Sequence, residues 1–164
     1  MTRGLPDLEY TRSILEYRDG MLFHKVNRGK AKKGNRAGHV CNLYRSLIIN
    51  KVIYYEHRVI FYIQHGWCPE YIDHINGNKQ DNRIENLRPA TAEQNTHNSR
   101  AKQSVSGVKG ITFDGRVSRW TARLRYDGKR KHLGNFATKE LAQEFIELAR
   151  EMVHGDYANH GTYA

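Results

Sequence analysis

The stretch from Tyr71 to Asn98 reads YIDHINGNKQDNRIENLRPATAEQNTHN, and it decides how the middle of this chain folds. It opens with an Asp-His pair, Asp73 and His74, on a short run of β-strand character, and a polar loop rich in Asn and Asp follows. A second short strand is expected at residues 87–89, with a helix after it. The predicted order is therefore strand, loop, strand, helix.

The start of this helix brings candidate metal ligands together. Thr91 followed by Gln94 matches a capping box, in which the hydroxyl and the amide satisfy free N–H groups of the first turn. Asn95 and Asn98 then share one helical face, and Asn95 can point back at the strand that carries Asp73. One carboxylate and one amide oxygen, completed by waters and a substrate phosphate, form a ligand set that Mg²⁺ or Mn²⁺ accepts.

These residue types together fit phosphodiester hydrolysis. The reaction needs a base that deprotonates the attacking water and a cation that stabilises charge on the phosphoryl and leaving oxygens. His74 would be the base, and Asp73 with Asn95 would hold the cation. Any one of these residues alone is more often a turn or cap residue, so the prediction rests on their joint occurrence.

The run D-H-I-N-G-N-x-x-D-N-R-x-x-N-L-R, which begins at Asp73, resembles the HNH endonucleases of the ββα-metal class, in particular homing enzymes of phages and introns. The resemblance extends back to about residue 54. It implies that His74 is the general base and that Asp73 and Asn95 are metal ligands. It also implies that Asn86 ties the two strands together and helps to orient His74. Asn95 stands at a signature position that otherwise holds histidine, a variant that the family also shows.

The region before the motif is expected to be mixed and rich in β-structure. Residues 28–36 (RGKAKKGNR) form a basic loop, which is either a solvated hairpin tip or a loop that contacts phosphate. The other expected elements are a helix at residues 8–17, strands at 21–25 and 46–55, and a helix at 56–65 that ends at Gly66.

A separate module is predicted after a small, polar linker at residues 101–107. Three antiparallel strands are expected at residues 108–113, 119–126 and 129–136, because Asp-Gly pairs separate them as hairpin turns. Thr138 then caps a helix that covers one face of the sheet. The apolar stripe of that helix is expected to comprise Leu141, Ala142, Phe145, Ile146, Leu148, Ala149 and Met152.

The middle strand of this module predicts a basic surface. Trp120, Ala122 and Leu124 fall on one side of the strand, whereas Arg123 and Arg125 fall on the other. An antiparallel sheet that presents arginines can enter the major groove of DNA, where arginine reads guanine and also neutralises phosphates. A solvated sheet with ordinary basic residues is the alternative interpretation.

The pattern G-V-x-G…W-x-A-x-L…G-K-x-x-x-L-G-x-F-x-T-x-E-x-A, which spans residues 107 to about 159, resembles the Apetala-type domain of plant ethylene-response factors. That domain also occurs beside HNH nucleases in phages. Arg123 and His132 stand where plant members often have an acid and a tryptophan, so the plant target sequence is not inherited. The DNA-contacting positions that the resemblance implies, with the nearby Arg116 added, are Lys109, Arg116, Arg119, Arg123, Arg125, Arg130 and His132.

The composition favours an anionic partner. Lys and Arg number 27 against 17 Asp and Glu, which gives a formal net charge of +10 in a chain of 164 residues. The longest apolar run, residues 59–63, is too short to span a bilayer, and the N-terminus has no apolar signal segment. We therefore expect a cytoplasmic protein with no membrane partner, located in a bacterial host cell if a phage encodes it. Cys41 and Cys68 are isolated, so neither a zinc ribbon nor a disulfide scaffold is predicted.

The predicted fold class is α+β. A ββα-metal HNH core at about residues 54–100 and a β-rich extension at 1–53 would form a nuclease domain at 1–104. A DNA-binding domain at 105–164 would contain a three-stranded antiparallel sheet packed on one helix.

The expected function is that of a monomeric, metal-dependent endonuclease that hydrolyses phosphodiester bonds of double-stranded DNA and nicks it in the manner of a homing enzyme. The principal alternative is a DNA-binding regulatory protein with an inactive nuclease centre, and the intact set of Asp73, His74, Asn86 and Asn95 argues against it. A third interpretation is an RNA-binding or structural partner protein, which competition between duplex DNA and RNA would reveal.

Overall fold

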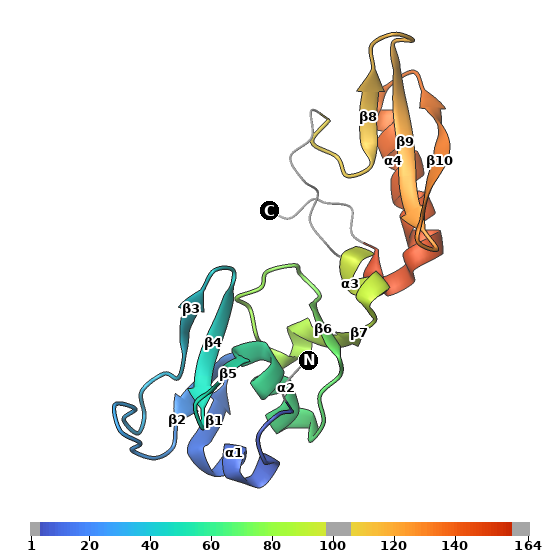
Figure 1. The fold of residues 1–164 in the computed structure, drawn as a ribbon. Helices are drawn as coiled ribbons and strands as arrows, with labels where there is room; N and C mark the ends of the chain where they lie inside the picture. The colour runs from blue at the N-terminus through green and yellow to red at the C-terminus, as the bar shows by residue number, and fades with distance from the viewer. Residues whose placement is uncertain (1–3, 98–105, 159–164) are drawn as a thin grey trace. The chain divides into compact units, whose positions relative to one another are not determined.

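The computed structural model describes residues 4–97 and 106–158, and the chain folds into two compact units that divide between Ala90 and Thr91. Each unit combines helices with small antiparallel sheets, in agreement with the predicted α+β class (Figure 1). The domain boundary predicted between residues 104 and 105 lies outside the described residues, as does most of the predicted linker. That boundary therefore stays a prediction.

The helix α2 (Glu56–His65) is the central element of the first unit and contacts α1, β2, β4, β5 and η1. Each of the strand pairs around it is antiparallel. The other elements of this unit are α1 (Leu8–Ile14), the pair β1 (Leu15–Arg18) and β2 (Met21–His24), the sheet β3 (His39–Cys41), β4 (Tyr44–Ile49) and β5 (Val52–Tyr55), and the pair β6 (Tyr71–His74) and β7 (Leu87–Ala90), with the 3-10 helix η1 (Ile84–Asn86) between them in the chain.

The core of the first unit forms on the buried side of α2. Val59, Ile60 and Phe61 are at most 2% exposed and share one apolar cluster with Leu22 of β2. Burying an apolar side chain of this size contributes roughly 1.5–3 kcal/mol. Gly66, with a φ of 77°, ends the helix in the left-handed conformation that suits glycine, and both ends of α2 are where the sequence predicts them.

The first helix is shorter than the predicted span of residues 8–17. It begins after Asp7, whose side chain accepts a hydrogen bond from the Tyr10 N–H, and it ends at Ile14. Leu15 is extended and buried, and it begins the hairpin with β2. Strand pairing in the folded unit thus outweighs the helical pattern in the second half of this segment.

The single strand predicted at residues 46–55 is a hairpin of two strands, β4 and β5. Asn50 and Lys51 form the turn between them with positive φ values of 51° and 65°, a conformation that matches the twist of a tight hairpin. The segment contains no Asn-Gly or Asp-Gly pair, so the turn has no strong sequence signal. The short, exposed strand β3 was not predicted either.

The second unit begins with α3 (Ala92–His97), and the predicted capping box precedes it. The Thr91 N–H donates to the Gln94 side chain, and the Gln94 N–H donates to the Thr91 hydroxyl. The remaining elements are β8 (Ile111–Asp114), β9 (Arg119–Tyr126), β10 (Lys129–Phe136), α4 (Lys139–His154) and the 3-10 helix η2 (Gly155–Tyr157).

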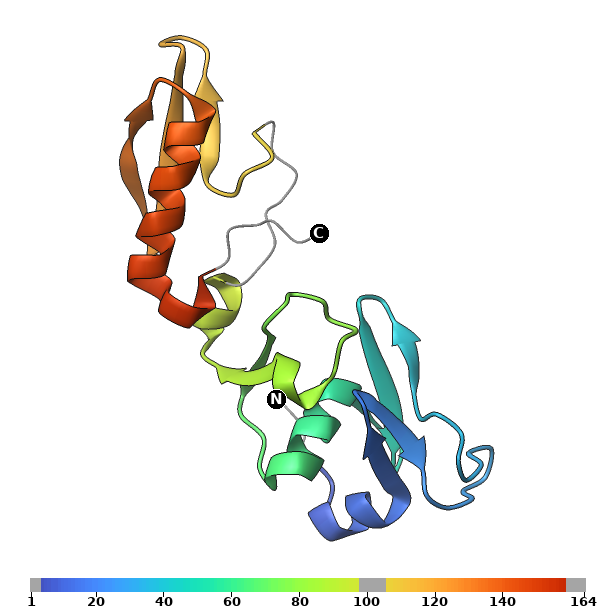
Figure 2. The ribbon, with the colours of Figure 1, turned by 180° about the vertical axis from the view of Figure 1, so that it is seen from behind.

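The three strands form one antiparallel sheet in the order β10-β9-β8, and α4 lies along one face of it (Figure 2). The bounds of β9 and β10 agree with the prediction, whereas the first strand begins at Ile111 and not at residue 108. Thr138 caps α4 through a hydrogen bond that its hydroxyl accepts from the Leu141 N–H. No helix in the described part of the chain has the length and apolar character needed to cross a bilayer.

The apolar stripe predicted on α4 is only partly buried. Ala142 and Ile146 are fully buried against the sheet, together with Arg150, whose guanidinium donates to the backbone oxygen of Lys109. A three-stranded sheet covers a narrower strip than the stripe occupies. The apolar side chains that remain exposed are Leu141, Phe145, Leu148 and Met152.

The β1–β2 turn approaches the segment that precedes η1 closely at Gly20, and a substitution there can test this approach. A Cβ at Gly20 (φ +76°) would lie 2.8 Å from the backbone nitrogen of Arg83, whereas one at Gly34 (φ +84°) meets nothing within 4 Å. Both Gly→Ala changes strain the backbone by roughly 1 kcal/mol, but only Gly20→Ala adds an overpacking cost of roughly 1–3 kcal/mol. Urea unfolding of the two variants measures the difference, and equal destabilisation would contradict the close approach.

Candidate active site

The candidate site is built on β6 and β7, which place Asp73 and His74 side by side in the chain and directly opposite Arg88 and Leu87. Asp73 and His74 are only 3% and 5% exposed. The Arg88 guanidinium donates to Asp73 Oδ2 through Nε at 2.9 Å, and its Nη2 atom lies 2.8 Å from the same oxygen. This ion pair across the two strands fixes the Asp73 carboxylate.

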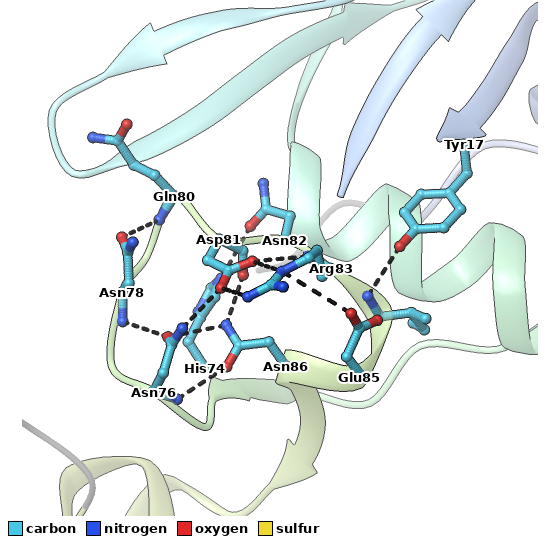
Figure 3. Close-up of polar contacts among 11 residues, drawn as sticks. Tyr17, His74, Asn76, Asn78, Gln80, Asp81, Asn82, Arg83, Glu85 and Asn86 are labelled. Atoms are coloured by element: carbon cyan, nitrogen blue, oxygen red, sulfur yellow. Dashed lines mark hydrogen bonds and ion pairs between the residues drawn. The ribbon is translucent and has the colours of Figure 1, made fainter. Parts of the chain in front are cut away.

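The imidazole of His74 is held by a buried amide. His74 Nε2 lies 3.0 Å from Asn82 Oδ1, and both side chains are buried (Figure 3). The Asn82 amide in turn donates through Nδ2 to Glu56 Oε2 at 3.0 Å, and Glu56 is fully buried in the first turn of α2. A chain of hydrogen bonds therefore links the central helix to His74.

A group of aromatic rings packs around the other side of this histidine. The His57 ring meets the His74 ring edge-on, with centroids 5.1 Å apart, and it stacks on Tyr55 at 5.7 Å. Tyr44 lies 6.2 Å from His74 between ring centroids, and the Lys79 ammonium lies 4.9 Å from the Tyr44 centroid. The imidazole of His74 thus sits in a packed environment that draws on the β4–β5 hairpin and α2.

Burial keeps both histidines neutral at pH 7. It lowers the pKa of His57 to about 3, with help from the nearby His74 and Arg58. Burial also lowers the pKa of His74, although the hydrogen bond to Asn82 and the charge of Asp73 act in the opposite direction. A neutral imidazole is the form that can accept a proton from water.

The loop between β6 and β7 closes on itself through Asn86. The Asn86 side chain accepts from the Asn76 N–H at 3.0 Å, donates to Asn76 Oδ1 at 3.0 Å and donates to the backbone oxygen of Asp81 at 2.7 Å (Figure 3). Hydrogen bonds from Arg83 lower the pKa of Asp81 to about 2, so its carboxylate is ionised and holds the end of the loop. The loop is therefore tied at both ends by its own side chains.

Comparison with known proteins places this arrangement in a family. The family model HNH_3, described as HNH endonuclease, matches residues 54–97, which include β6, η1, β7 and α3. Protein 3.8 of Escherichia phage T7 is 32% identical over 91 residues, which cover 54% of this chain and 73% of that protein.

The chain contains an HNH endonuclease domain. It is also 32% identical over 105 residues to a protein of Acanthamoeba polyphaga mimivirus named uncharacterized HNH endonuclease L560, and the match covers 62% of this chain and 54% of that protein. No solved structure matches this HNH endonuclease. This domain, together with the similarity to a protein named an HNH endonuclease, supports a nuclease that acts on DNA.

The structure brings two of the four predicted nuclease residues together. Asp73 and His74 adjoin each other on β6, as predicted. Asn86 ties the loop between the two strands, and the direct hydrogen bond to the His74 ring comes from Asn82, so the predicted part of Asn86 in orienting His74 stays a prediction. Asn95 is exposed on α3 and belongs to the second unit, so its pairing with Asp73 as a metal ligand stays a prediction.

Sequence reasoning missed Glu56, Asn82 and His57 as members of the site. Asn82 stands inside the D-N-R stretch of the motif and could have been chosen, but nothing in the pattern says which way its side chain points. Glu56 and His57 lie about 17 residues before the motif core, where the sequence pattern indicates only an ordinary helix start. Among the described residues, no three His, Cys, Asp or Glu side chains cluster as metal ligands.

The predicted DNA-contacting residues lie mainly on one face of the second unit's sheet. Arg125 pairs with Arg130 across β9 and β10, and Arg123 pairs with His132, so these four share the face opposite α4, and all four are exposed. Arg119 lies on the same face of β9, at its start.

Two of the predicted contact residues lie away from this face. Arg116 forms an ion pair with Asp114 in the β8–β9 turn. Lys109 precedes β8 and is half-buried, and burial beside Arg150 lowers the pKa of Lys109 to about 8.

Proposed function

We propose that this protein is a metal-dependent endonuclease that nicks double-stranded DNA, with His74 as the general base. The observation that carries the proposal is the buried, hydrogen-bonded imidazole of His74 next to the Asp73 carboxylate on β6. In the reaction, His74 accepts a proton from water while the water oxygen attacks phosphorus, and one P–O ester bond of the strand breaks. Asn86 supports this step by holding the loop that carries Asn82.

The residues present suit a hard divalent cation. Asp73 supplies a carboxylate, which Arg88 contacts at Oδ2. Asn95 would add an amide oxygen, and waters with a DNA phosphate would complete the set that Mg²⁺ or Mn²⁺ prefers. The bound cation would stabilise negative charge on the phosphoryl and leaving oxygens.

We further propose that residues 105–164 form an Apetala-type DNA-binding domain, and that its sheet grips the duplex. Arg123, Arg125 and Arg130 stand close together on the exposed face, and none of them forms an ion pair with another described residue. Like charges directly opposite one another on a sheet are destabilising, so the cluster suits a surface that meets a polyanion.

The biological setting follows from these proposals. One catalytic centre in a monomer cuts one strand at a time, which suits a nicking enzyme of homing type. The similarity to a phage T7 protein supports an enzyme that a phage encodes and that works inside the bacterial host cell. A DNA-binding regulator with an inactive centre is the alternative, and an absence of nicking by the intact protein in Mg²⁺ or Mn²⁺ would favour it.

Replacing His74 with Ala should lower plasmid nicking in Mg²⁺ by about 10²–10⁴-fold, because the water loses its base, while affinity for DNA stays close to that of the unchanged protein. Conversion of supercoiled plasmid to open circles measures the rate, and a gel-shift assay measures binding. The same change at His39, which is exposed on β3, is the matched control and should leave both unaffected. Equal nicking by His74→Ala and the unchanged protein would refute the base assignment.

Replacing Arg123 or Arg125 with Ala should weaken DNA binding by roughly 1–3 kcal/mol for each lost base contact and reduce the salt dependence of binding. Lys131→Ala is the matched control, since Lys131 is exposed on β10 but pairs with Leu124 and so points to the other face. Fluorescence anisotropy at several salt concentrations measures both effects. If the three variants lose affinity equally, the sheet face has no special role.

A further inference from the structure

We propose that Asn82 and Glu56 are positioning residues of the nuclease: the Glu56 carboxylate fixes the Asn82 amide, and this amide fixes the orientation and tautomer of His74. The inference rests on the proposed role of His74 as the base. It adds two residues to the machinery that neither the motif prediction nor the comparisons assign.

Glu56 is held in place by groups from distant parts of the first unit. Its side chain is 0% exposed, and its Oε1 atom accepts from the Leu22 N–H of β2 at 3.3 Å. Arg45 Nε lies 3.1 Å and an Arg36 guanidinium nitrogen lies 3.9 Å from Oε2. The Arg45 N–H is not aligned for a hydrogen bond, so this contact is an ion pair only. The carboxylate is thereby anchored against rotation.

The anchored carboxylate settles which way the Asn82 amide faces. A carboxylate only accepts hydrogen bonds, so the group that meets Glu56 Oε2 at 3.0 Å must be the Nδ2 amino group of Asn82. The Oδ1 atom then faces His74 Nε2 at 3.0 Å. An amide flip would place two acceptors against each other at Glu56.

The direction of the amide in turn selects the form of His74. Asn82 Oδ1 can only accept a hydrogen bond, so Nε2 of His74 must carry the hydrogen of the neutral ring. The hydrogen bond at one ring nitrogen thus decides the protonation of the other. The neutral ring therefore presents the lone pair of Nδ1, and the base function falls to that atom. The ring contacts with His57 and Tyr44 limit rotation but do not distinguish the two nitrogens.

A purely structural role for Asn82 predicts a different result from this positioning role. Asn82 is 1% exposed, so any change there costs stability. If the side chain only fills space and satisfies Glu56, activity should follow stability from variant to variant. If it positions His74, activity should follow the presence of a hydrogen-bond acceptor at Nε2, whatever the stability.

Three variants separate the two roles: Asn82→Ala removes the side chain, Asn82→Leu keeps its approximate volume, and Asn82→Asp keeps an acceptor toward His74. Asn82→Asp places a second carboxylate beside Glu56, and two carboxyl groups at that distance share a proton, so we expect it to be no more stable than Asn82→Leu. Its kcat should nevertheless exceed that of Asn82→Ala and Asn82→Leu, in which kcat falls by at least about 10-fold. The KM for plasmid DNA should stay unchanged in all three.

Nicking of supercoiled plasmid in Mg²⁺ at several DNA concentrations gives kcat and KM, and urea unfolding of the full chain gives stability. Asn78→Ala, an exposed change in the same loop that leaves Asn82 and Glu56 intact, is the control and should keep the original kcat. Should Asn82→Ala fail to fold, the comparison of Asp with Leu still decides.

Two results would overturn the inference. One is a kcat of Asn82→Leu equal to that of the unchanged protein, and the other is a kcat of Asn82→Asp no higher than that of Asn82→Leu. His74→Ala run beside them separates this failure from that of the proposed function. Full activity of His74→Ala removes the base assignment itself, whereas an inactive His74→Ala with an unaffected Asn82→Leu removes only the positioning role.

Discussion

The buried carboxylate of Glu56 is the constraint on which the first unit depends. It stands in the first turn of α2, and its partners come from β2, from the loop before β3, from β4 and from the loop before η1. Leaving a buried charge without its partners typically costs about 3–5 kcal/mol, so these segments must assemble together for any of them to be stable. The same carboxylate is linked to His74 through the side chain of Asn82. The contacts that stabilise the fold therefore also set the geometry of the nuclease site.

Packing around the site serves the chemistry in a second way. The rings of His57 and Tyr44 pack against His74, and burial lowers the pKa of both histidines. A histidine that stays neutral near pH 7 is ready to accept a proton. The carboxylates of Asp73 and Asp81 each pair with an arginine, as that of Glu56 does with Arg45, so the charges near the base are compensated.

Much of the fold follows from local sequence signals. The ends of α2, the capping box at Thr91, the strands β9 and β10 and the cap at Thr138 each rest on a few neighbouring residues, and each is found as predicted. The errors arise where long-range pairing decides. Leu15 leaves the first helix to pair with β2, and a turn with no glycine divides β4 from β5.

The residues of the candidate site also differ in whether local sequence or long-range contacts reveal them. Asp73 and His74 are adjacent in sequence and could be predicted from the motif, whereas Glu56 could not, because its partners are 11 to 34 residues away along the chain, at Arg45 and Leu22 among others. Only the assembled fold shows that a helix-start glutamate contacts the amide that holds the base. The exposed apolar residues of α4 illustrate the same limit, since periodicity gives the stripe but not the width of the sheet that covers it.

The form of the His74 ring tests the central claim most directly. Nitrogen-15 NMR of the histidine side chains, with His74→Gln used to assign the signal, distinguishes a ring that carries its hydrogen on Nε2 from one that carries it on Nδ1. Since burial lowers the pKa of His74, the neutral ring can be observed at pH 7. We predict the Nε2–H tautomer in the unchanged protein, and a predominant Nδ1–H tautomer would contradict the account.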